Sequence, residues 1–140
     1  MVMSNKTLLA GTLATAVFLF LIDYLYYGTF GFMSLDPGVL REMPDFIFLT
    51  IGYLVFGLFF TYFAGKYSDD LSRLSQGFIY GLLIGFLVFS LTILTRYATE
   101  QIDIFVMMNN LVFNILKMGA AGAVLVLVTK PSRWGKTPPA

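Results

Sequence analysis

Cysteine and histidine are absent from the 140 residues, and charged residues are scarce. Without cysteine the chain has no disulfide and no thiolate nucleophile, and without histidine it has no imidazole base and no histidine-ligated haem or zinc. The net charge is only +1, so neither a basic surface for nucleic acid nor an acidic surface for a cationic substrate is expected. We therefore predict a protein that is not an enzyme, has no catalytic residues and holds no metal and no cofactor.

Apolar side chains are abundant instead. Hydrophobic residues make up 58% of the chain and charged residues 12%, whereas soluble domains average about 25% charged. The mean hydropathy is +0.81. This composition predicts an integral membrane protein whose main partner is the lipid bilayer.

Four mostly uncharged segments are each long enough to cross a hydrocarbon core, which takes roughly 20 helical residues. They cover about 7–27, 46–65, 74–95 and 104–129, and a basic tail follows at 130–140. Because short connections leave consecutive helices as neighbours, the predicted fold is all-α: a single domain, 1–140, that forms an antiparallel bundle of four transmembrane helices.

The basic residues predict the orientation of this bundle. One side of the membrane would carry six of them, against two, Arg41 and Arg96, on the other. The six are Lys6, Lys66, Arg73, Lys130, Arg133 and Lys136. Since the side richer in lysine and arginine stays in the cytoplasm, we expect a multi-pass protein of the cell membrane with both termini cytoplasmic.

The fourth span carries polar side chains in its middle. Asn110, Asn114 and Lys117 follow one another at i, i+4 and i+7, so a helix places all three on one face. A lysine at the centre of a span costs about 2.5–3.5 kcal/mol when it faces lipid, so this face should look into protein or a wet cavity. The spacing therefore predicts an intramembrane polar layer.

Asp23 is the one acidic residue well inside an apolar segment, and the predicted topology brings it near that layer. At 1.5 Å per residue, Asp23 lies about 8 Å below the outer edge of the membrane and Lys117 about 20 Å below it. Their side chains tilt toward each other, and the lysine stem spans much of the gap. The two charges can neutralise one another as a structural pair, or form a ligand- or proton-handling site. Alternatively, Asp23 lies in the outer interface and Lys117 contacts a partner subunit.

Glycines are spaced for close helix packing. Gly77, Gly81 and Gly85 form two consecutive G-x-x-x-G steps on the third span, and Gly119 and Gly122 belong to a run of small residues on the fourth. We interpret these faces as contacts within the fold, with a homo-oligomer or a protein partner as the alternative occupant.

The order of these features resembles a group of small bacterial four-span inner-membrane proteins classified only as a domain of unknown function. The matching residues are Ile22-Asp23-Tyr24-Leu25-Tyr26 with Gly28, then Gly77, Gly81 and Gly85, and finally Asn110 and Asn114. Tyr26 stands where that group has tryptophan, and amides with Lys117 stand where a carboxylate is expected. The resemblance implies an architecture and no activity.

Two functions follow as predictions. The glycine faces and the small catalytic inventory favour a non-enzymatic accessory or assembly subunit of a membrane complex. The alternative is a small transporter or ligand-binding membrane protein that uses the layer formed by Asp23, Asn110, Asn114 and Lys117. A cavity that connects that layer to either aqueous side would favour the alternative, and a dry, fully packed layer with an exposed glycine face would favour the subunit.

Overall fold

The computed structural model describes residues 3–30, 45–67 and 71–133. They form four helices, α1 (Asn5–Phe30), α2 (Phe46–Tyr67), α3 (Leu74–Thr99) and α4 (Ile104–Arg133), and these residues contain no strand. The predicted all-α chain with four helices in one bundle is confirmed. Each helix contains a stretch that is long and apolar enough to cross a membrane.

The helices continue a few residues past the spans predicted from the sequence. One of the largest differences between the predicted and the observed helix ends is in the fourth helix, after which a basic tail was expected from residue 130. Because α4 continues to Arg133, the first residues of that segment are helical, and residues 134–140 lie outside the described part of the chain.

Side chains cap the starts of the helices. Asp45 precedes α2, and its Oδ1 accepts hydrogen bonds from the backbone N–H groups of Ile47 (3.1 Å) and Phe48 (3.3 Å). Asp103 does the same for α4, at 2.8 Å from the N–H of Phe105. A carboxylate here satisfies N–H groups that have no partner inside the helix and faces the positive end of its dipole. Polar residues thus mark where each of these apolar helices begins.

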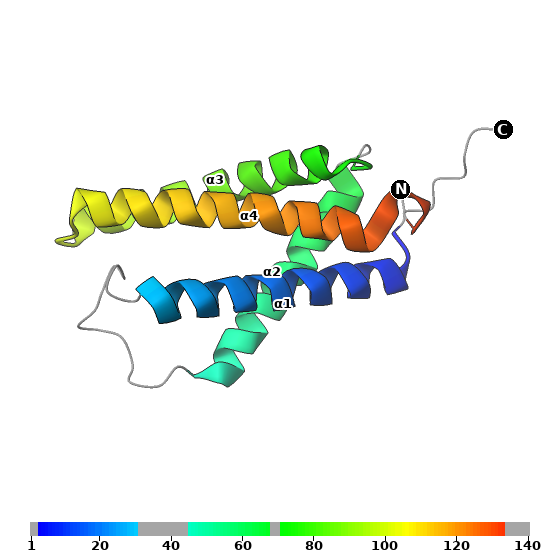
Figure 1. Ribbon diagram of the computed structural model, residues 1–140, viewed down its shortest axis with the longest axis horizontal. Helices are drawn as coiled ribbons and strands as arrows, with labels where there is room; N and C mark the ends of the chain where they lie inside the picture. The colour runs from blue at the N-terminus through cyan, green and yellow to red at the C-terminus, as the bar shows by residue number, and fades with distance from the viewer. Residues whose placement is uncertain (1–2, 31–44, 68–70, 134–140) are drawn as a thin grey trace.

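The four helices are not equally aligned. Figure 1 shows α3 alongside α4 and α1 next to α4, whereas α2 crosses the other three at a steep angle. The closest packing is between α3 and α4, and α1 packs against both α2 and α4. α1 begins and α4 ends at the same end of the molecule (Figure 1). The tilt of α2 means that its two halves have different surroundings.

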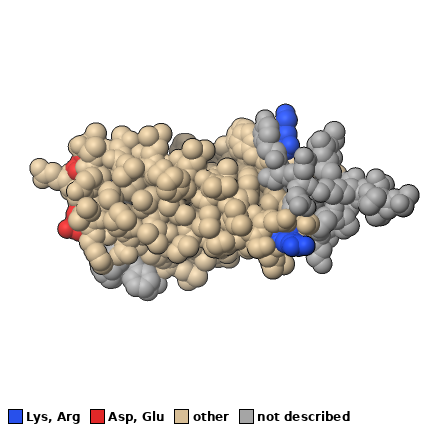
Figure 2. Space-filling view, turned by 90° about the horizontal axis from the view of Figure 1, so that it is seen from above, with Lys and Arg blue, Asp and Glu red and all other residues tan. Residues whose placement is uncertain are grey.

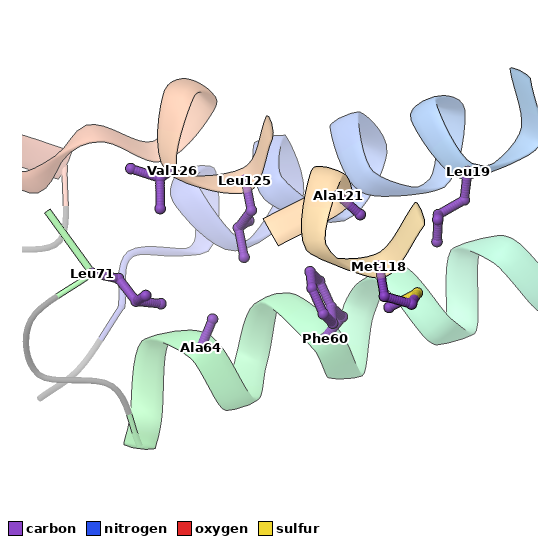
Figure 3. Packing of buried hydrophobic residues seen from close by; sticks show 8 residues of the cluster. All are labelled: Leu19, Phe60, Ala64, Leu71, Met118, Ala121, Leu125 and Val126. Atoms are coloured by element: carbon purple, nitrogen blue, oxygen red, sulfur yellow. The ribbon is translucent and has the colours of Figure 1, made fainter. Parts of the chain in front are cut away.

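The apolar core surrounds the C-terminal half of α2. Figure 3 shows side chains from α1, α2 and α4 that point toward one another between these helices. The cluster consists of Leu19, Phe60, Ala64, Leu71, Met118, Ala121, Leu125 and Val126. Tyr80 joins α3 to this region, because its hydroxyl donates to the carbonyl of Phe60 at 2.7 Å and its ring lies 4.9 Å from the Phe60 ring.

The glycine seam, which we define as Gly77, Gly81, Gly85, Gly119 and Gly122, joins α3 to α4. A Cβ atom added at Gly77 would meet the carbonyl oxygen of Gly122, and one added at Gly81 would meet the carbonyl oxygen of Met118. At Gly85 it would lie 2.8 Å from the Met118 Cβ. The two backbones approach this closely only because these positions lack side chains.

Candidate functional site

Asp23 and Lys117 form an ion pair between α1 and α4. Lys117 Nζ lies 2.8 Å from Asp23 Oδ1. The Lys117 side chain is 6% exposed and the Asp23 side chain 13% exposed. The sequence estimate left a vertical gap of about 12 Å between the two residues. The structure brings the two charges into direct contact, with the long lysine side chain reaching from α4 to Asp23 on α1.

Lys117 is held on several sides. Its ammonium also donates to Asn114 Oδ1 at 2.8 Å, one turn earlier on α4. The ring centres of Phe89 and Phe113 lie 5.4 Å and 5.6 Å from Nζ, within the range in which an aromatic face attracts a cation. Tyr26 stacks on the Phe113 ring with centroids 3.5 Å apart, which joins α1 to α4 beside the ion pair.

Asp23 has a second partner that the sequence analysis did not identify. The hydroxyl of Tyr53 on α2 donates to Asp23 Oδ2 at 2.5 Å. Its ring also meets that of Phe20 on α1 edge to face, with centroids 5.9 Å apart. A phenol inside an apolar span was the available signal, but Tyr62 lies in the same span, so the sequence did not single out Tyr53. Tyr53 connects α2 to the ion pair.

Asn110 shares the polar face of α4 but not the ion pair. It is only 1% exposed, and its amide donates to the carbonyl of Val106 at 2.9 Å. The amide of Asn114 in turn donates to the carbonyl of Asn110 at 2.7 Å. Three of the four residues of the predicted layer, Asp23, Asn114 and Lys117, are therefore joined by side-chain bonds. The fourth, Asn110, lies one turn nearer the start of α4.

A cleft of about 390 Å³ opens beside the ion pair. α2 crosses the other helices at an angle (Figure 1), and residues of its N-terminal half form one wall of this space. We call this space the ion-pair cleft. Its lining comes from all four helices: Leu19, Asp23, Phe48, Leu49, Gly52, Tyr53, Phe56, Phe89, Asn114, Lys117 and Met118.

The cleft combines an apolar wall with a few convergent polar groups, as ligand pockets of this size usually do. Gly52 has no atom within 4 Å of where its Cβ would lie, so the wall is open there. The polar groups are one ammonium, one carboxylate, one phenol and one amide, and the two charges cancel. This arrangement can bind and orient a molecule that has a polar head and an apolar body.

The glycine seam lies outside the cleft. Gly77, Gly81 and Gly85 are buried by α4 of the same chain, and none of them lines the cleft. Contact within the fold, one of the two occupants considered from the sequence, accounts for these glycines. They position α3 and α4, and therefore Phe89, Asn114 and Lys117, without taking part in binding.

Comparison of the chain with known protein families, with curated proteins and with solved structures finds no match. The resemblance to small bacterial four-span membrane proteins therefore stays a prediction.

Proposed function

We propose that this chain is a multi-pass membrane protein, an antiparallel bundle of four transmembrane helices, and that its ion-pair cleft binds a small amphipathic ligand. It would act as a small transporter or ligand-binding protein and not as an enzyme. The observation that carries the proposal is the cleft itself. A fully packed polar layer would have pointed to a structural role, whereas here about 390 Å³ of open space adjoins Asp23 and Lys117.

The exposed side chains support the membrane setting. Ile47 and Phe48 on α2 are 72% and 74% exposed, an arrangement that is costly in water and ordinary in lipid. On the face shown in Figure 2, charged side chains gather at the two ends and leave an uncharged band between them. Such a band is what a hydrocarbon core requires of the surface that it contacts.

The test of ligand binding uses Gly52, where an added side chain meets nothing and would fill the cleft. Wild-type protein purified in mild detergent should retain a small amphipathic molecule that mass spectrometry of an organic extract detects. Gly52→Leu should lose it. Gly28→Leu is the matched control, because Gly28 is also open and does not line the cleft. Equal retention by both variants would contradict the proposal.

The proposed orientation places both termini in the cytoplasm and rests on the six-to-two distribution of basic residues. The chain has no cysteine, so single cysteines report without interference. Cysteine introduced at Ser34 should react with a membrane-impermeant thiol reagent in intact cells, and cysteine at Ser132 should react only after lysis. The reverse pattern would invert the topology.

An accessory or assembly subunit of a membrane complex stays the second candidate. The glycine faces no longer support it, because α3 and α4 cover each other, and its remaining support is the exposed apolar side of α2. Cross-linking from a photoreactive residue at Ile47 in native membranes would test it. A discrete protein adduct would favour a subunit, and labelling of lipid alone would leave ligand binding as the better proposal.

A further inference from the structure

We propose that the ligand of the ion-pair cleft is a free long-chain monocarboxylic acid, and that it binds as a carboxylate on Lys117 while Asp23 takes up one proton. This inference rests on the proposed function of the cleft and names its ligand class. In the structure the Asp23 carboxylate is bonded to Lys117 Nζ, and on binding the ligand carboxylate would replace it there.

A monocarboxylic acid meets the charge balance of this site when Asp23 takes up its proton. Lys117 and Asp23 cancel, and both are nearly buried. An anion that entered without compensation would add a net charge in a medium of low dielectric constant, which costs several kcal/mol. If Asp23 is protonated as the ligand binds, the site holds one ammonium, one ligand carboxylate and one neutral acid. The net charge is then zero before and after binding.

The step also balances in atoms. A carboxylic acid that enters from lipid in its neutral form transfers its proton to Asp23 Oδ1, and its carboxylate then pairs with Lys117 Nζ. The Asp23–Lys117 ion pair is exchanged for a ligand–Lys117 ion pair. No electron is transferred and no covalent bond is formed or broken except those of the moving proton.

The two oxygens of Asp23 are already divided in the way that this exchange needs. Oδ1 faces Lys117, while Oδ2 accepts the hydroxyl of Tyr53. After protonation at Oδ1, Oδ2 is the carbonyl oxygen and still accepts from Tyr53, and the new O–H can donate to the ligand carboxylate. No polar group of Asp23 is left unsatisfied, which is the main cost of breaking a buried pair.

Lys117 keeps its position during the exchange because other contacts hold it. Asn114 Oδ1 and the rings of Phe89 and Phe113 remain around the ammonium when Asp23 is replaced. Among the described residues, the charged or titratable groups bonded to Asp23 are Lys117 from α4 and Tyr53 from α2. The residue that α3 contributes to the cleft, Phe89, is apolar.

The rest of the cleft suits an acyl chain. Leu19, Leu49, Phe56 and Met118 line it with apolar surface, and the open position at Gly52 lets a chain leave sideways. A phosphate monoester would bring a second negative charge and need a second proton. A cationic amphiphile would have to separate Asp23 from Lys117 and leave that ammonium without its carboxylate.

Calorimetric titration of purified protein in an uncharged detergent with dodecanoate tests the inference. The titrations are run in buffers of different ionisation enthalpy, at pH values where the free ligand is ionised. Wild-type protein should take up about one proton per dodecanoate bound, and its apparent Kd should rise about tenfold per pH unit. Dodecan-1-ol, a neutral ligand with the same chain, should bind more weakly and without proton uptake.

Asp23→Asn imitates the protonated aspartate. It should bind dodecanoate without proton uptake and with a Kd that does not change with pH, while dodecan-1-ol binding stays as in wild type. Should this variant fail to fold, the pH dependence of the wild type decides. If the wild-type protein binds dodecanoate without proton uptake, or binds dodecan-1-ol with equal affinity, the inference is overturned. Alcohol binding that Gly52→Leu abolishes, with no dodecanoate binding, would overturn the inference and leave the proposed function standing. No effect of Gly52→Leu on either ligand would overturn both.

Discussion

The glycine seam and the ion-pair cleft show two ways in which helices of one bundle can meet. In the seam, residues without side chains let the α3 and α4 backbones touch, and no space remains. At the cleft, Tyr53 joins the N-terminal half of α2 to Asp23, and the neighbouring side chains of α2 line open space beside this contact. The α3 and α4 backbones are therefore in direct contact, whereas open space remains beside the N-terminal half of α2.

This difference explains why the polar residues lie where they do. Lys117 and Asn114 are bonded to each other on α4, the helix that the seam joins to α3. Asp23 and Tyr53, which complete the polar group around Lys117, stand on α1 and α2. If the cleft binds a ligand as proposed, the lysine would be placed by the tightly packed α3–α4 pair, and sites placed by well-packed elements are more precise than sites on loops.

The largest expected effect comes from breaking the ion pair. Lys117→Met leaves Asp23 nearly buried without its cation, and should lower the free energy of unfolding by about 3–5 kcal/mol. Asp23→Asn should cost less, since an amide oxygen can still accept from Lys117. In a double-mutant cycle measured by unfolding in mixed detergent, the double variant should lose less than the sum of the single losses. Strict additivity would show that the two groups are not coupled.

The next effect compares two glycines directly. Gly81→Ala places a methyl group against the carbonyl of Met118 and should destabilise the bundle by about 1–3 kcal/mol. Gly52→Ala meets no atom within 4 Å and should raise stability by up to about 1 kcal/mol through helix propensity. Thermal unfolding of the two variants measures both. Similar changes in the two would mean that the seam is no tighter than the cleft.

A similar effect, at the lower end of that range, is expected from Tyr53→Phe, which keeps the ring and removes the hydroxyl that donates to Asp23. Hydrogen bonds to charged groups contribute about 1.5–3 kcal/mol, and partial access of Asp23 to the open cleft should bring the loss toward the lower value. The Phe20 ring contact is retained, so it serves as an internal control for packing. Wild-type stability in this variant would show that α2 does not depend on the bond.

The smallest effect is expected at the far end of α3, where Arg96 and Glu100 form an exposed pair with 2.9 Å between Nη2 and Oε2. The Arg96 side chain, mainly through its hydrogen bond, lowers the pKa of Glu100. A carboxyl group whose pKa is lower in the folded than in the unfolded protein stabilises the fold at pH values above its unfolded-state pKa. This stabilisation is lost as the pH falls through the folded-state pKa. Glu100→Gln should therefore remove only a slight acid sensitivity below about pH 4, visible as a small change in melting temperature.

Part of the site could be predicted from the sequence because it depends on spacing within one helix. Asn110, Asn114 and Lys117 share a face through helical geometry alone, and Asp23 stood out because a carboxylate inside an apolar segment is costly. Tyr53 could not be singled out in the same way. A phenol within a span is compatible with several surroundings, and its bond to Asp23 joins residues 30 positions apart.

The lengths of the four apolar segments, the acidic caps before α2 and α4, and the glycine spacing on α3 are local properties, so the sequence by itself determined the helices and where they begin. The tertiary structure decided three other things: that α4 covers the glycines, that the lysine stem reaches Asp23, and that α2 tilts away to leave a cleft. These depend on how helices cross. Crossing angles follow from the packing of side chains on several helices at once, and no single segment encodes them.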